Sequence, residues 1–227
     1  MRRTRLSRRR FAGFLSLLLG GRWLSAPPRA VAAGTPMCSF TAEQLAILGH
    51  QANAFPGLSA VRRELPPGFP FHSALQPLHY CAAYVFFWEV PFEALVRDPD
   101  ADANRAHSDL LLAFPTAGDA SDAFHDLVAL SRSPTATQRD PQHRIDDENA
   151  PSLGEERLAQ STTEFGTEID GDGTRHEEPN IAQYDFAFRR GPVLVLSDDT
   201  FSPDAADFGL ALSLAEALDA RIAAALQ

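Results

Sequence analysis

Alternating carboxylates lie between Glu168 and Thr174, where the sequence reads EIDGDGT. Carboxylates at every second position of a tight loop can converge on Ca²⁺. The register of a calcium loop is not met, because Pro179 stands where the loop would need a bidentate Glu. We interpret the segment as a hairpin turn formed by Asp-Gly, and weak metal binding by Asp170 and Asp172 stays open.

The histidines show no spacing typical of metal ligands. A helix that binds zinc commonly places two ligands four residues apart, and no two histidines have this spacing. A pair such as His72 and His79 could meet only through the fold. We therefore predict no metal ligands and expect surface or internally hydrogen-bonded roles for all seven histidines: His50, His72, His79, His107, His125, His143 and His176.

Motifs for nucleophilic or phosphate chemistry are absent from the sequence. It contains no G-x-S-x-G turn, no Walker loop and no G-x-G-x-x-G fingerprint. Arg189 and Arg190 could bind an anion, but a turn at a sheet edge, where arginine charges discourage pairing with another strand, is the simpler explanation. We predict no catalytic residue and no cofactor. A run of aromatic residues is assigned to the core rather than to a ligand pocket: Phe86, Phe87, Trp88 and Phe92.

Cys38 and Cys81 are the only cysteines. Neither has a C-x-x-C neighbour or the surroundings of a nucleophile, and in an oxidising compartment an even pair forms a disulfide. The bridge would close a loop of about 43 residues and stabilise the fold by roughly 4 kcal/mol. We therefore predict a disulfide that joins the first helix of the mature chain to the segment around Tyr80.

The first 33 residues have the order of an export signal. Six arginines precede a short apolar run at 11–19, and small residues follow at 30–33. The apolar run has about ten residues, whereas a membrane span needs roughly 20. We predict a cleavable signal at 1–33, no stable membrane anchor, and a mature chain at 34–227.

The basic part of this signal resembles the twin-arginine export consensus at Ser7, Arg8, Arg9 and Phe11. Ala12 and Gly13 depart from that consensus, so general secretion remains an alternative route. The resemblance implies contact with the export machinery and a periplasmic or extracellular location. Twin-arginine export carries folded proteins and is often used when a cofactor is loaded first, which leaves an enzyme or a cofactor carrier as an alternative function.

The charge balance argues against nucleic acid as a partner. The full chain has a formal net charge of −10, and every basic residue is an arginine. Removal of the signal leaves 12 basic and 30 acidic side chains, which is a net charge of −18. Since a phosphate backbone is bound by Lys and Arg, we expect no nucleic acid partner. Such a charge also favours a monomer in solution.

The mature chain divides into helical and extended patterns. Helical spacing predicts a helix at 41–54, and another runs to about residue 130 with Asp119 or Ser121 as its N-cap. Aromatic and branched residues predict strands at 80–90 and 108–114. The segment 131–151 has three prolines and few apolar residues, and we expect a flexible loop there.

The C-terminal third alternates short extended segments with turns. Strands are expected at 157–169, 184–188 and 193–197, as in an antiparallel meander. A last helix follows, with Ser202 as N-cap and Pro203 as its first residue. Close spacing leaves no room for crossover helices between these strands. We therefore predict one α+β domain in which helices pack on one face of an antiparallel sheet.

Several segments resemble exported bacterial proteins of unassigned function, and the architecture resembles PsbP-like domains. The segments are LPPGF at 65–69, FPTAGDASDAFHDL at 114–127, LGEERLA at 153–159, YDFAFRRGPVLVL at 184–196 and ALSLAEALDARI at 211–222. None of them is catalytic. The expected function is a non-enzymatic module that binds a small molecule or an envelope protein.

Overall fold

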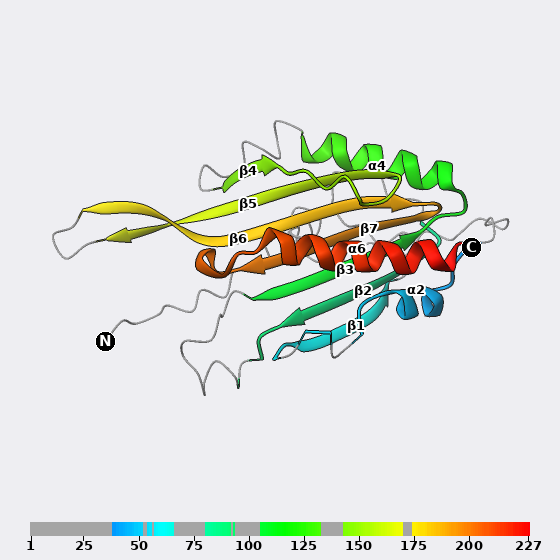
Figure 1. Ribbon diagram of the computed structural model, residues 1–227, viewed down its shortest axis with the longest axis horizontal. Coiled ribbons are helices and arrows are strands. Elements are labelled where there is room, and N and C mark those ends of the chain that lie inside the picture. The colour runs from blue at the N-terminus through cyan, green and yellow to red at the C-terminus, as the bar shows by residue number, and fades with distance from the viewer. Residues whose placement is uncertain are drawn as a thin grey trace, which may run out of the picture.

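Seven strands form one antiparallel sheet in the computed structural model of the chain (Figure 1). The structure describes residues 38–51, 54–55, 57–65, 80–91, 93, 105–132, 143–169 and 174–227. The strands are β1 (Ser59–Leu65), β2 (Ala82–Glu89), β3 (Ala106–Ala113), β4 (His143–Asp147), β5 (Glu156–Ile169), β6 (Arg175–Arg190) and β7 (Val193–Phe201). The helices are α2 (Ala42–Leu48), α4 (Ala117–Ser131), the 3-10 turn η1 (Pro203–Ala205) and α6 (Phe208–Ala225).

The sheet consists of two meanders that meet at one pair of strands. The order is β1-β2-β3-β7-β6-β5-β4, so β3 of the first meander pairs with β7 of the second. In this pairing His107 lies opposite Asp199, and Leu111 lies opposite Val195. The predicted α+β class and antiparallel sheet are confirmed, and the expected meander at 157–197 corresponds to β5, β6 and β7.

Helices cover both faces of the sheet, whereas helices on one face only had been expected. In β7, Val193 and Val195 belong to a core beneath α2 and α6, while Leu194 and Leu196 belong to a second core beneath α4. Figure 1 shows α6 lying along the strands and α4 along the upper edge. The reason is that central strands such as β7 are apolar at consecutive positions, so both of their faces require cover.

Two helices begin at threonine caps. The Thr41 hydroxyl accepts a hydrogen bond from the Gln44 backbone N–H, and the Gln44 side chain accepts one from the Thr41 backbone N–H. At α4 the same reciprocal pair joins Thr116 and Asp119. Asp119 is thus the third residue of α4 and not its N-cap, because Thr116 supplies the capping oxygen. The helix ends at Ser131, close to the predicted end.

The last helix begins later than predicted. Ser202 and Pro203 do start a helical turn, but it is the 3-10 turn η1, and the Ser202 side chain makes no capping bond. The N-cap of α6 is Asp207, whose carboxylate accepts a hydrogen bond from the Leu210 backbone N–H at 3.0 Å. A side-chain cap at Asp207 therefore sets the start of the α-helix.

Some of the connections also differ from the predictions. The helix expected at 41–54 ends at Leu48. The segment 131–151, expected to be a loop, contains β4, which pairs with β5. Exposed Arg144 and Asp146 alternate in β4 with the less exposed Ile145. An edge strand tolerates such a polar composition because one of its two edges pairs with no other strand. The tip of the expected turn, 170–173, lies outside the described residues.

The predicted disulfide is present. Cys38 and Cys81 are bonded, with 5.7 Å between their Cα atoms. Cys38 precedes α2, and Cys81 lies directly before β2, where its backbone N–H donates to the Ala113 carbonyl at 2.9 Å. The bridge therefore fastens the N-terminal end of the described chain to the sheet.

Candidate functional site

The candidate site is a buried cluster of histidine and aspartate side chains between β3, β7 and the segment after α2. His107 and Asp109 alternate along β3, so their side chains share one face of the sheet. Asp199 lies opposite His107 on β7. His50 lies outside the sheet, two residues after the end of α2, and its side chain contacts Asp109 of β3. His107 and Asp109 are 0% exposed and His50 is 5% exposed.

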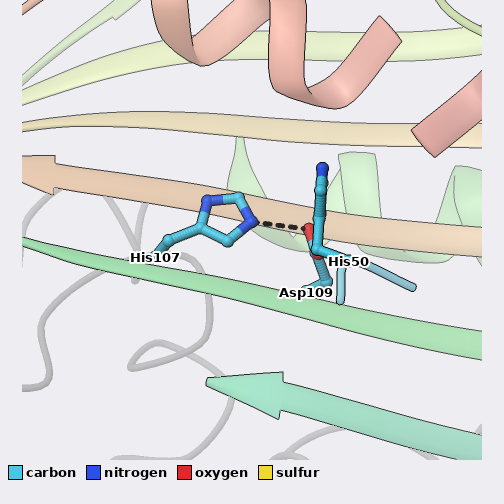
Figure 2. A group of neighbouring side chains, drawn as sticks. All are labelled: His50, His107 and Asp109. Carbon is cyan, nitrogen blue, oxygen red and sulfur yellow. Dashed lines mark hydrogen bonds and ion pairs between the residues drawn. The ribbon is translucent and has the colours of Figure 1, made fainter. Parts of the chain in front are cut away.

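Asp109 lies at the centre of this cluster. His50 Nδ1 donates a hydrogen bond to Asp109 Oδ2 at 2.6 Å. His107 Nε2 lies 3.2 Å from Asp109 Oδ1, and its Nδ1 lies 3.1 Å from Asp199 Oδ2. These two His107 contacts have the distances of ion pairs but not the angles of hydrogen bonds. Figure 2 shows the contact between His107 and the Asp109 carboxylate as a dashed line, and the His50 ring overlaps Asp109 in this view.

Charge neutralisation controls protonation in the cluster. Burial alone would lower the pKa of His107, but attraction to Asp109 and Asp199 outweighs burial and raises it to about 10. Burial would likewise raise the pKa of Asp109, and His107 with His50 holds it far below its usual range. An ionised Asp109 and a protonated His107 therefore neutralise each other inside the sheet.

The position of His50 depends on the end of α2. At Gly49 an added Cβ would lie 2.1 Å from the Phe86 ring, so the chain can pass there only as glycine. Arg221 of α6 donates to the Leu48 carbonyl at 2.7 Å, and Arg62 of β1 donates to the His50 carbonyl at 3.2 Å. Cationic side chains near the C-terminal end of a helix can hydrogen-bond its last carbonyls, as Arg221 does here. Together with the bond from Arg62 to the His50 carbonyl, this contact fixes the position of His50.

Aromatic rings enclose the two histidines. Phe55 stacks on the His107 ring with 4.3 Å between the centroids. Trp88, which pairs with His107 across β2 and β3, lies 5.2 Å from the same ring. His50 contacts both Phe55 and Trp88 edge-on. This apolar wall lowers the local dielectric, which strengthens every charge interaction within the cluster.

A second polar group lies on the opposite face of the same strands. The Ser108 hydroxyl donates to Asp198, which lies opposite Asp185 on β6. Burial and the neighbouring charge of Asp185 raise the pKa of Asp198 to about 7. Gln183 donates to Asp185 at 2.6 Å, and Thr162 does so at 3.3 Å. Both faces of the β3–β7 pair thus bury acidic side chains at the same end.

The residues singled out in the sequence have other roles or lie outside the described residues. Arg189 contacts Glu155 and Glu156, and Arg190 contacts Asp219, so both are ion-paired and do not form an anion site. Phe86 and Trp88 are core residues, as predicted. The following residues lie outside the described ranges: Ser7, Arg8, Arg9, Phe11, His72, His79, Phe92, Asp170 and Asp172.

Sequence reasoning assigned His50 and His107 only surface or internally hydrogen-bonded roles, and it did not single out Asp109 or Asp199. The signal that could have found the cluster is the His107-x-Asp109 alternation at the start of an otherwise apolar strand, together with Asp198 and Asp199 at the end of another. Polar residues on the inner face of a strand must find partners in the fold. Spacing along the chain does not show which residues of distant segments meet in the fold.

Comparisons with known proteins give the fold and no family. No family model and no curated protein sequence matches the chain. Among solved structures, it is similar to the extracellular domain of PknH from Mycobacterium tuberculosis, with 11% identity and a TM-score of 0.50, over 82% of this chain and 96% of that one. Within the described residues, none of the helices is long and apolar enough to cross a membrane.

Proposed function

We propose that the chain is an exported, non-enzymatic module that binds a small molecule or a protein at the cell envelope, after removal of residues 1–33. The observation that carries this proposal is the Cys38–Cys81 disulfide. Disulfides of this kind persist in the periplasm and outside the cell and are rare in a reducing cytosol. The likeness in fold to an extracellular domain also supports export.

The alternative is an exported enzyme or cofactor carrier that the twin-arginine route delivers folded. The observation that favours it is the buried cluster around Asp109, since strongly shifted pKa values gather at functional sites. Buried ion-pair networks shift pKa values as well, and the described part of the cluster is enclosed by aromatic rings. For this reason the binding module remains the primary proposal.

The export part of the proposal is tested with the full chain in a host that has both export routes. The wild-type chain is expected in the periplasm, starting near Ala33 or Gly34 and lighter by two hydrogens for one disulfide. Replacing Arg8 and Arg9 by lysine should abolish export, whereas the same change at Arg2 and Arg3 is the matched control and should leave it intact. An unprocessed chain with free thiols would contradict export.

The binding part is tested by comparing native and denaturing mass spectra of the exported protein. Extra mass that is lost on denaturation would identify a bound molecule or partner chain. Turnover of substrates in a panel of hydrolase and redox assays would overturn the non-enzymatic assignment and favour the alternative.

A further inference from the structure

Several polar atoms at the centre of the buried cluster have no hydrogen bond, although His107 and Asp109 form an ion pair there. One potential ligand atom from each of His50, His107 and Asp109 lies within 4.8 Å of the others. Among the described residues, His50 Nε2, His107 Nε2 and Asp109 Oδ1 are buried and have no hydrogen-bond partner. Buried polar atoms without a hydrogen bond are uncommon inside native proteins, and a group of them is a sign of a bound water or ion.

The donor set has the chemistry of a transition-metal site. Two imidazoles and one carboxylate suit Zn²⁺ and its first-row neighbours, whereas Ca²⁺ and Mg²⁺ prefer oxygen ligands alone. Ligand atoms of a tetrahedral Zn²⁺ lie about 3.4 Å apart. The 3.2 Å between His107 Nε2 and Asp109 Oδ1 is close to this spacing. The 2.6 Å between His50 Nδ1 and Asp109 Oδ2 is shorter, so an ion would replace that hydrogen bond.

The surroundings of His107 also match a metal-binding histidine. Its other ring nitrogen, Nδ1, lies 3.1 Å from Asp199 Oδ2. Asp199 is held in turn by Arg105 at 3.1 Å, and the Arg105 guanidinium lies 4.1 Å from the centre of the Phe201 ring. A carboxylate behind the imidazole orients the ring and increases its basicity toward a metal, and this partner is common around metal-ligating histidines.

We infer that His50, His107 and Asp109 bind one divalent first-row transition-metal ion of the Zn²⁺ type, which displaces the Nε2 proton of His107 to solvent, with Asp199 as a positioning residue. The ion would fasten the segment after α2 to β3, in addition to the disulfide that lies before α2. The inference goes beyond the proposed function and does not depend on export, because metal binding is measured on the purified mature chain whatever route it took.

The test is a titration of the mature, disulfide-bonded chain with Zn²⁺ after removal of metals by a chelator. We expect one Zn²⁺ per chain and a rise in melting temperature on binding. X-ray absorption of the Zn²⁺-loaded wild-type protein should show two imidazole ligands and no sulfur. This measurement needs no variant, so it decides the ligand set even where a substitution in the core prevents folding.

Three variants separate this site from a surface site. His50→Gln removes a ligand from a segment outside the sheet and should weaken Zn²⁺ binding by at least about tenfold. Asp199→Asn should weaken it by about tenfold to a hundredfold while the two-imidazole absorption signature persists, as expected for a positioning residue. His125→Gln is the matched control, since His125 is 65% exposed and contacts Glu156 on the surface.

Two results would overturn the inference. One is the absence of stoichiometric Zn²⁺ binding, which would show that the cluster is a self-contained ion-pair network. The other is binding that survives His50→Gln in a folded protein, or that is lost in His125→Gln, since either would place the ion elsewhere. An absorption spectrum with fewer than two imidazoles would lead to the same conclusion.

Discussion

Two aspartates on the same pair of strands show how neighbours determine the effect of burial on single residues. Asp109 and Asp198 are both buried on the β3–β7 pair, on opposite faces. The pKa of Asp109 is lowered because His107 and His50 stabilise its charge. The pKa of Asp198 is raised to about 7 because burial and the neighbouring Asp185 disfavour the charge. Similar burial thus produces opposite protonation at neutral pH.

Asp198 should make the protein less stable as the pH rises. Its pKa is raised in the folded state, so between about pH 4 and pH 7 the folded chain holds a proton that the unfolded chain releases. The free energy of unfolding should fall over this window, by at most about 4 kcal/mol from this group. Asp198→Asn keeps a neutral side chain beside Ser108 and should reduce the pH dependence.

The measurement is urea unfolding at pH 5 and at pH 8 for the wild-type chain and for Asp198→Asn. The charged groups that influence Asp198 are Asp185 on the same face of the sheet and His107 and Asp199 on the other face, and all three remain in both proteins. Asp126→Asn on the exposed surface of α4 is the control and should leave the wild-type slope unchanged. An equal slope in the wild type and Asp198→Asn would contradict the prediction.

Removal of Asp109 should be strongly destabilising. Asp109→Ala leaves the protonated His107 buried with only Asp199 to balance it and removes the hydrogen bond to His50. Removing one partner of a buried ion pair lowers the free energy of unfolding by about 3–5 kcal/mol. Urea unfolding with chelator present checks this free energy without any contribution from metal. Asp126→Ala should change it by less than about 0.5 kcal/mol, and a similar small loss for Asp109→Ala would disprove the ion pair's importance.

At the scale of elements, the site depends on where α2 ends. The helix stops at Leu48, and the next residue approaches the Phe86 ring so closely that no side chain fits. Arg221 donates a hydrogen bond to the Leu48 carbonyl, and Arg62 donates one to the His50 carbonyl just beyond the helix. Placement of His50 therefore follows from a glycine, two arginines on other elements and an aromatic ring in β2.

Gly49→Ala should destabilise the junction between α2 and the sheet. Its Cβ would lie 2.1 Å from the Phe86 ring, and overpacking of this kind costs about 1–3 kcal/mol. Gly118→Ala in α4 is the matched control, because its Cβ would meet only the Thr116 hydroxyl at 3.6 Å. The control should be neutral or more stable by up to about 1 kcal/mol. Thermal unfolding of both variants checks the prediction, which fails if their shifts are alike.

At the scale of the whole molecule, the β3–β7 pair joins two meanders and lies between helices on both faces. The two cores are separate sets of side chains that share the central strands. Figure 1 shows β5 and β6 extending as a ribbon beyond the other strands. The disulfide connects the start of the described chain to β2, one strand away from this central pair.

Loss of the disulfide should lower the stability of the entire domain. The bridge closes a loop with a sequence separation of 43 residues, and the unfolded chain gains freedom when it is removed. The double variant Cys38→Ser/Cys81→Ser is expected to unfold with about 4 kcal/mol less free energy than the oxidised wild type. Reduced wild-type protein is the control and should behave like the variant. If reduction leaves the melting temperature unchanged, the bridge contributes no net stability.

The sequence by itself determined the class of the domain, most of its strands and its disulfide. Local patterns suffice for these features: aromatic and branched runs favour strands, Asp-Gly and Gly-Pro favour turns, and an isolated cysteine pair in an exported chain forms a bridge. The export signal at 1–33 and its removal remain predictions. Some predictions were wrong: β4 lies where a loop was expected, helices cover both faces of the sheet, and α6 starts at a second possible cap a few residues further on.

Only the tertiary structure decided which residues meet. His50 lies 57 positions before His107, and Asp199 lies 92 positions after His107. Asp199 meets His107 through the pairing of β3 with β7, which joins the two meanders, and no local pattern specifies that pairing. The same reason explains why helices cover both faces: β7 is apolar on consecutive positions, and its own sequence does not say which helix covers which side. Contacts between distant segments arise from packing of the whole chain, so the candidate site became visible only in the folded molecule.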